Sequence, residues 1–125
     1  MTTKSDIVDR VRKRVKDIPT AITDTDIENF VEDAKYDLIA NGTISIDLDD
    51  IEDKYVGLLT NATSIYVLCY MYNVGISYNL GRIRVDKRTE IEGIDKLINF
   101  LVNRVNSQLN NMGGWIKHNY TQPYG

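Results

Sequence analysis

The sequence has little of what enzymes and metal proteins commonly use for their chemistry. Cys69 is the one cysteine and His118 the one histidine among 125 residues. A single cysteine excludes an internal disulfide and a cysteine-based zinc cluster. A single histidine near the end of the chain has no second ligand or catalytic partner close to it in sequence. The phosphate-loop, dinucleotide-binding and zinc-protease motifs are missing too, so we predict no enzyme activity, no metal and no cofactor.

Charge is missing from one long stretch. No residue from Tyr55 to Leu80 is charged, although charged residues make up 26% of the chain. As a helix this stretch is long enough for a membrane span, so it must be a span, a buried helix or a surface that partner subunits cover. Polar residues such as Asn61 and Asn73 interrupt the apolar run that a span needs. We therefore predict a central helix buried on nearly every side over residues 62–74, and a partner-covered surface only at residues 76–80.

The remaining composition is that of an ordinary globular chain. At 125 residues and 42% hydrophobic content, we expect one domain with a modest core, neither disordered nor disulfide-rich. The start from Met1 to Asp6 is polar and no apolar segment follows it. We therefore expect no signal peptide and a location in a reducing cytoplasm.

Charge is distributed in blocks along the chain. Residues 1–20 carry six Lys/Arg against three Asp, and residues 21–54 carry eleven acids against two Lys. Residues 82–125 are basic again, with seven Lys/Arg against four acids. This separation favours self-association through complementary faces over uniform coating of DNA.

Apolar residues at helical spacing predict an all-α fold. Thr3 with Asp6 resembles a capping box, and Thr23 is a good N-cap with acids in the turn that follows. We expect a small bundle of about four helices, over residues 4–16, from the Thr23 cap to the Asn41–Gly42 stop, over 51–73 and over 89–111. A short β-hairpin or extended segment before the last helix has its best strand at residues 82–85, and alternation makes a second short strand possible at residues 43–48. Residues 1–112 form the helical domain, and residues 113–125 form an extended aromatic C-terminal tail.

Several residue groups have both a functional and a structural interpretation. The acids after Asp47 do not match a calcium loop, because the sixth residue is Glu52 and the twelfth is Leu58. Cys69 lies among apolar neighbours, which favours an inert core thiol. The basic residues of the first helix could contact phosphates, but we favour a solvated charged face opposite its apolar stripe.

The order of these elements resembles the small head–tail connector proteins of tailed phages, also called adaptor or head-completion proteins. The resemblance covers roughly residues 20–112 and rests on residues 23–34, on the run from Ala62 to Tyr72 and on residues 81–85. It is a pattern of lengths and hydrophobicity, without a catalytic signature. Residues 1–20 depart from it.

The resemblance implies a structural virion protein without enzymatic activity. Its subunits would form a dodecameric ring beneath the portal protein, in the neck of the virion, after assembly in the host cytoplasm. The ring would extend the DNA channel, without sequence-specific DNA binding, and provide the platform for a stopper or tail-completion protein. The implied tail contacts with the portal are Trp115, Ile116, Tyr120 and Tyr124, and the implied contacts between subunits are Tyr78, Arg82, Ile83, Arg84 and Val85.

A second hypothesis comes from another class of protein. A small helical nucleic-acid-binding protein, such as a regulator or packaging component, would use the basic first helix with Arg82, Arg84, Lys87 and Arg88. It requires DNA binding that weakens steeply with salt. The acidic second helix argues against docking as a helix-turn-helix reader.

Overall fold

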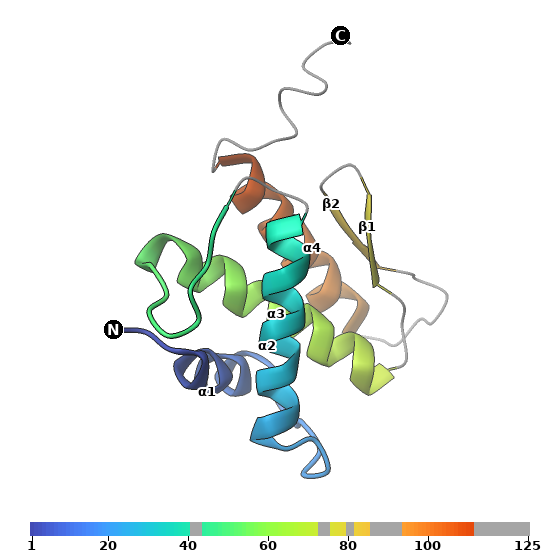
Figure 1. The fold of residues 1–125 in the computed structure, drawn as a ribbon. Coiled ribbons are helices and arrows are strands. Elements are labelled where there is room, and N and C mark those ends of the chain that lie inside the picture. Colours follow the sequence, from blue (N-terminus) through green and yellow to red (C-terminus); the bar gives the residue numbers. More distant parts are fainter. Residues whose placement is uncertain (41–43, 73–75, 80–81, 86–93, 112–125) are drawn as a thin grey trace, which may run out of the picture.

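A computed structural model of the chain describes residues 1–40, 44–72, 76–79, 82–85 and 94–111. The elements are α1 (Lys4–Arg14), α2 (Asp24–Ala40), α3 (Asp53–Tyr72), β1 (Ile76–Asn79), β2 (Arg82–Val85) and α4 (Ile94–Asn111) (Figure 1). The expected all-α class with four helices is confirmed. Residues 113–125, the expected tail, lie outside the described residues, as do residues 89–93 at the expected start of the last helix.

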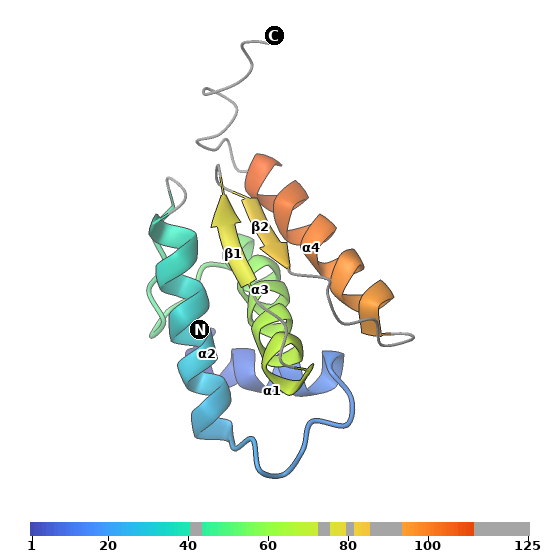
Figure 2. The ribbon, with the colours of Figure 1, turned by 90° about the vertical axis from the view of Figure 1, so that its right-hand side faces the viewer.

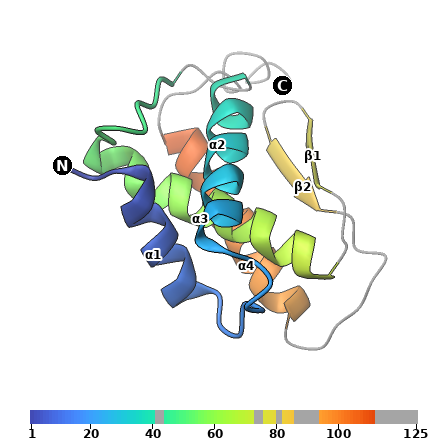
Figure 3. The same ribbon diagram turned by 60° about the horizontal axis from the view of Figure 1, so that its bottom comes forward.

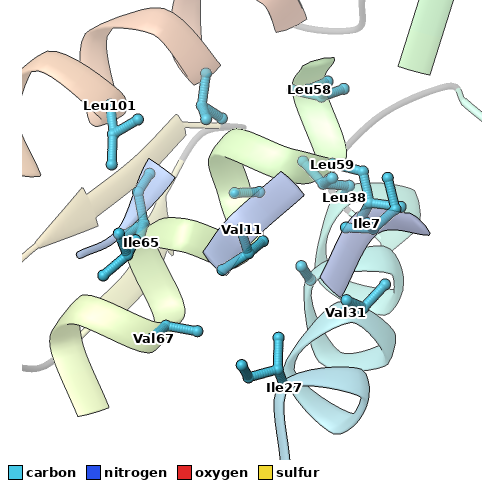
Figure 4. Close-up of a cluster of buried hydrophobic side chains, with 14 of the residues drawn as sticks. Ile7, Val11, Ile27, Val31, Leu38, Leu58, Leu59, Ile65, Val67 and Leu101 are labelled. Carbon is cyan, nitrogen blue, oxygen red and sulfur yellow. The ribbon is translucent and has the colours of Figure 1, made fainter. Parts of the chain in front are cut away.

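The charge-free stretch forms the centre of the bundle. Helix α3 contacts α1, α2 and α4, and all its residues from Tyr55 to Cys69 are buried except Gly57 and Tyr66. Figure 4 shows Leu58, Leu59 and Ile65 of α3 within the cluster that the neighbouring helices complete. A helix with protein on almost every side cannot carry charge without a large desolvation penalty, which explains the missing charges. The prediction of a buried central helix is confirmed, although burial begins at Tyr55 and ends before Tyr70.

Local capping explains where the first two helices begin. The Thr3 backbone N–H donates a 2.8 Å hydrogen bond to the Asp6 carboxylate at the start of α1. At α2 the Thr23 N–H donates to Asp26 at 2.9 Å, and the Asp26 N–H donates to the Thr23 hydroxyl at 3.2 Å. Both pairs satisfy backbone donors that a helix start leaves open. Helix α1 ends at Arg14, two residues before its expected end.

The segment between α2 and α3 corrects one expectation. Residues 44–48 form no strand, and the alternation there has another cause, because the apolar side chains of the segment pack against the core. The Lys4 N–H donates to the Leu48 carbonyl at 3.0 Å, and Thr2 and Ile51 form an isolated antiparallel bridge. Ile46 and Ile51 are buried. Every second side chain of the segment, at Ile44, Ile46 and Leu48, therefore packs on the core, although the segment pairs with neither β1 nor β2.

The described helices do not include one with the length and apolar content that crossing a membrane requires.

Helix α4 has its buried face at Ile98, Leu101, Val105 and Leu109, at the spacing of one helical stripe. Figure 2 shows α4 and α2 on opposite sides of α3, with α1 crossing below and the two strands between α2 and α4.

Candidate functional site

The expected contacts between subunits lie on a pair of short strands. Strands β1 and β2 are antiparallel and pair Ile76 with Val85, Ser77 with Arg84, Tyr78 with Ile83, and Asn79 with Arg82. Directly opposed residues of a ladder lie on the same face. The register therefore places Tyr78 and Ile83 on one face and Arg82 and Arg84 on the other, so one face is apolar by sequence and one is basic.

The surroundings of the two strands differ from each other. Strand β2 lies beside α4, as Figure 2 shows. Within the described part of the chain, β1 pairs with β2 alone, so its outer edge has no strand partner. An edge strand offers unpaired backbone N–H and C=O groups to another chain. The expected contact residues thus lie together beside α4, next to an edge to which a further strand could add.

The expected portal-binding residues cannot be placed. Trp115, Ile116, Tyr120 and Tyr124 lie outside the described residues, and so does His118. The arrangement of β1 and β2 is therefore the part of the expected site whose backbone geometry is known.

The basic side chains of α1 fall into two groups. The first group faces α2: the Lys4 ammonium lies 2.8 Å from a Glu32 carboxylate oxygen, and Arg12 Nε lies 2.6 Å from Asp24 Oδ1. Arg12 also donates to the Ile22 carbonyl at 3.2 Å. The hydrogen bond with Lys4 lowers the pKa of Glu32, and the same bond raises the pKa of Lys4. The acids of α2 therefore neutralise the cations on this side of α1.

The second group is Arg10, Lys13 and Arg14, on the other side of α1. Their spacing of three and four residues places them on one face of the helix, and all three are exposed. Among the described residues no acid pairs with any of them. Together with Gly57 and Thr60 of α3 they line a groove of about 420 Å³, here called the α1–α3 groove. Figure 3 shows α1 lying beside α3 on this side of the bundle.

The α3 side of this groove contains polar groups that the core leaves unsatisfied. Thr60 and Asn61 are each 3% exposed. The Asn61 side-chain N–H donates to Gln108 Oε1 of α4 at 3.2 Å. Within the described part of the protein, the Thr60 hydroxyl and the Asn61 carbonyl oxygen have no hydrogen-bond partner. Buried polar atoms without partners are rare in native folds, and of these two residues Thr60 is the one that lines the groove.

Chemically reactive groups are scarce in the described residues. Burial raises the pKa of Cys69 to about 12, which removes the thiolate that nucleophilic or metal-binding chemistry needs. Over the same residues, no group of three or more His, Cys, Asp or Glu side chains could hold a metal ion.

Three exposed aromatic side chains lie on different helices, and the sequence did not reveal their exposure. Tyr70 is 66% exposed, and its ring centroid lies 5.4 Å from that of Phe30 across the α2–α3 contact. Tyr36 on α2 and Phe100 on α4 are also exposed, at 64% and 53%. Phe30 is partly buried against the core, whereas the Tyr70 ring beside it is exposed, which only the packing of α2 on α3 shows. Exposed aromatics are typical of protein contact surfaces.

No protein-family model, curated protein or solved structure gives a significant match to this chain.

Proposed function

We propose that this chain is a structural virion protein, one subunit of a ring-shaped head–tail adaptor in the neck of a tailed phage. The ring binds the portal protein, extends the DNA channel and gives the stopper or tail its platform. The observation that carries the proposal is the strand pair between α3 and α4, with its unpaired β1 edge. In a ring, that edge and the apolar face containing Tyr78 and Ile83 contact the next subunit.

The helical part of the molecule supports this proposal. A ring subunit needs a rigid body and exposed contact surfaces. Helix α3, buried against three other helices, supplies the rigid body. Tyr70, Tyr36 and Phe100 supply exposed aromatic surface on α3, α2 and α4. Aromatic side chains of this kind dominate the energetics of protein interfaces.

The strands and the tail have separate roles in the proposed assembly. The β1–β2 pair is a hairpin that joins neighbouring subunits, and residues 113–125 are an extended tail that docks on the portal. Trp115, Ile116, Tyr120 and Tyr124 anchor that tail. The chain needs no cofactor and catalyses no reaction in this role.

The test is assembly on the portal protein of the same phage. We expect the purified chain to bind portal rings, visible by negative-stain microscopy and by co-elution in gel filtration. A chain that ends at residue 112 should lose portal binding. The double variant Tyr78→Ser with Ile83→Ser should leave the helical circular dichroism unchanged while preventing closed rings.

The control is Asp33→Asn, which removes an exposed charge from α2 and should assemble normally. A reconstruction of the neck without density for this chain next to the portal would overturn the proposal. So would a truncated chain that binds the portal as well as the complete one, because the tail would then have no docking role.

A further inference from the structure

The unpaired cations of α1 follow from what lies on each side of that helix. Its α2 side meets a helix with seven charged residues, six of them acidic, and Lys4 and Arg12 find partners there. Its α3 side meets the stretch from Tyr55 to Tyr72, which contains no charge at all. Arg10, Lys13 and Arg14 therefore have no carboxylate within reach on α3. The absence of charge from residues 55–72 thus allows α3 to be buried, and it also leaves these three cations of α1 without an acidic partner on that part of α3.

The groove between these helices is built from hydrogen-bond donors. Arg10, Lys13 and Arg14 provide cationic N–H groups along one wall. Thr60 lies on the other wall, and its buried hydroxyl has no partner among the described residues. Gly57 has no side chain, and a Cβ there would lie 3.2 Å from Gln108 Nε2. The Gln108 carbonyl oxygen accepts the hydrogen bond from Asn61, and its amide nitrogen is the atom nearest to Gly57. Among the described residues that line the groove, none carries a carboxylate.

We propose that the α1–α3 groove is a binding site for phosphate groups, either in a nucleic-acid backbone or in a free polyphosphate. A phosphate has several oxygens that accept charge-assisted hydrogen bonds, and arginine pairs with it in bidentate geometry. The volume of about 420 Å³ falls within the range of roughly 300–1,000 Å³ for small-ligand sites. The site goes beyond the proposed ring and does not depend on it, because all its described residues belong to one subunit.

The neighbouring acids limit the site to a short segment. Asp6 and Asp9 line the adjoining hollow that Arg10 and Lys13 share, and Asp17 lines a smaller one beside Arg14. These carboxylates repel a polyanion at both ends of the groove. With a net charge of −3 for the whole chain, long-range attraction to DNA is weak. The geometry therefore favours one or two phosphates held locally over extended coating of a duplex.

The experiment is an NMR titration of the ¹⁵N-labelled full chain. The probes are sodium pyrophosphate and a short DNA duplex at low salt, against sodium chloride at equal ionic strength. Both probes should shift the signals of Arg10, Lys13, Arg14 and Thr60 if the source is a nucleic acid. Shifts with pyrophosphate alone identify free polyphosphate as the source. Both results support the site.

Two variants separate the site from general electrostatics. Thr60→Val removes the unpartnered hydroxyl without changing charge, and should weaken pyrophosphate binding by about tenfold, the equivalent of one hydrogen bond to a charged group. Arg10→Gln with Arg14→Gln should abolish binding. The control Arg12→Gln removes a cation that Asp24 already neutralises and should bind pyrophosphate as the wild type does.

Three outcomes would overturn the proposal. The first is that pyrophosphate shifts the NMR signals of the groove residues no more than sodium chloride does. The second is that Thr60→Val binds pyrophosphate as tightly as the wild type, while its urea midpoint shows an intact fold. The third is an equal response to a glutamate-rich peptide, which would show an acidic protein segment as the occupant.

Discussion

The buried hydroxyl of Thr63 offers a direct test of the packing inside α3. Thr63 is 0% exposed, and among the described residues its Oγ1 has no hydrogen-bond partner. Its neighbour Ser64 differs, since the Ser64 hydroxyl donates to the Thr60 carbonyl at 2.8 Å. Valine has the same shape as threonine and nearly the same helix propensity. Thr63→Val should therefore remove a desolvation penalty without creating a cavity.

The size of the effect follows from the penalty for an unsatisfied buried group, about 1–3 kcal/mol. The free energy of unfolding should rise by that amount. This is a large fraction of the total for a typical domain, which is roughly 5–15 kcal/mol. In urea the midpoint should rise by about 1 M at an unchanged slope, given slopes of about 1–3 kcal/mol per molar. Both proteins are unfolded in urea and followed by circular dichroism at 222 nm.

The matched control is Thr25→Val, which makes the same chemical change at an exposed position in the first turn of α2. It should change stability by no more than about 0.5 kcal/mol. A midpoint for Thr63→Val that equals or falls below that of the wild type would refute the reasoning, because the hydroxyl would then have a partner. The same result would weaken the case built on the Thr60 hydroxyl one turn away.

Three further predictions concern other parts of the fold. Cys69, with its pKa raised to about 12 by burial, should resist iodoacetamide at pH 8 in the folded protein and react fully in urea; equal rates in both would contradict its burial. Thr23→Ala should lower the free energy of unfolding by about 1 kcal/mol through loss of the α2 cap, measured by thermal unfolding, whereas an unchanged melting temperature would count against the capping box. Glu32→Gln should lower the urea midpoint slightly at pH 7, because a surface pair contributes little. Since the pKa of Glu32 is lowered from 4.5 by Lys4, that difference is present above pH 4.5 and should vanish as the pH falls through the lowered value; a difference that persists at pH 2 would disprove the pairing.

Much of the helical fold could be predicted because its signals are local. The caps at Thr3 and Thr23 act through hydrogen bonds to residues three positions away, so the sequence contains both partners. The charge-free stretch from Tyr55 to Leu80 reports burial directly, since a charged side chain there would lose its hydration. These features place helices and identify the central one without knowledge of the tertiary structure.

The candidate sites depended on contacts between distant segments, which no local pattern contains. Arg10 and Arg12 are two residues apart on one basic helix, yet α2 neutralises Arg12, whereas Arg10 has no acidic partner among the described residues. The alternation at residues 44–48 indicated a strand. One face of the segment packs on the core instead, and the Leu48 carbonyl accepts a hydrogen bond from the Lys4 N–H of α1. Whether the basic residues of α1 form a solvated face or line a groove depends on which helix packs on each side of α1, and the sequence does not contain that information.

The two proposals together constrain how subunits would be oriented in a ring. The strand pair lies beside α4, whereas the α1–α3 groove lies where α1 crosses α3 (Figures 2 and 3). Neither site uses a residue of the other, so one subunit can present both surfaces. If both proposals hold and the phosphates belong to DNA, α1 must face the channel, and the acidic α2, whose charge repels DNA, must face away from it. A ring with α2 lining the channel would be compatible with the adaptor role but would exclude DNA as the ligand of the groove.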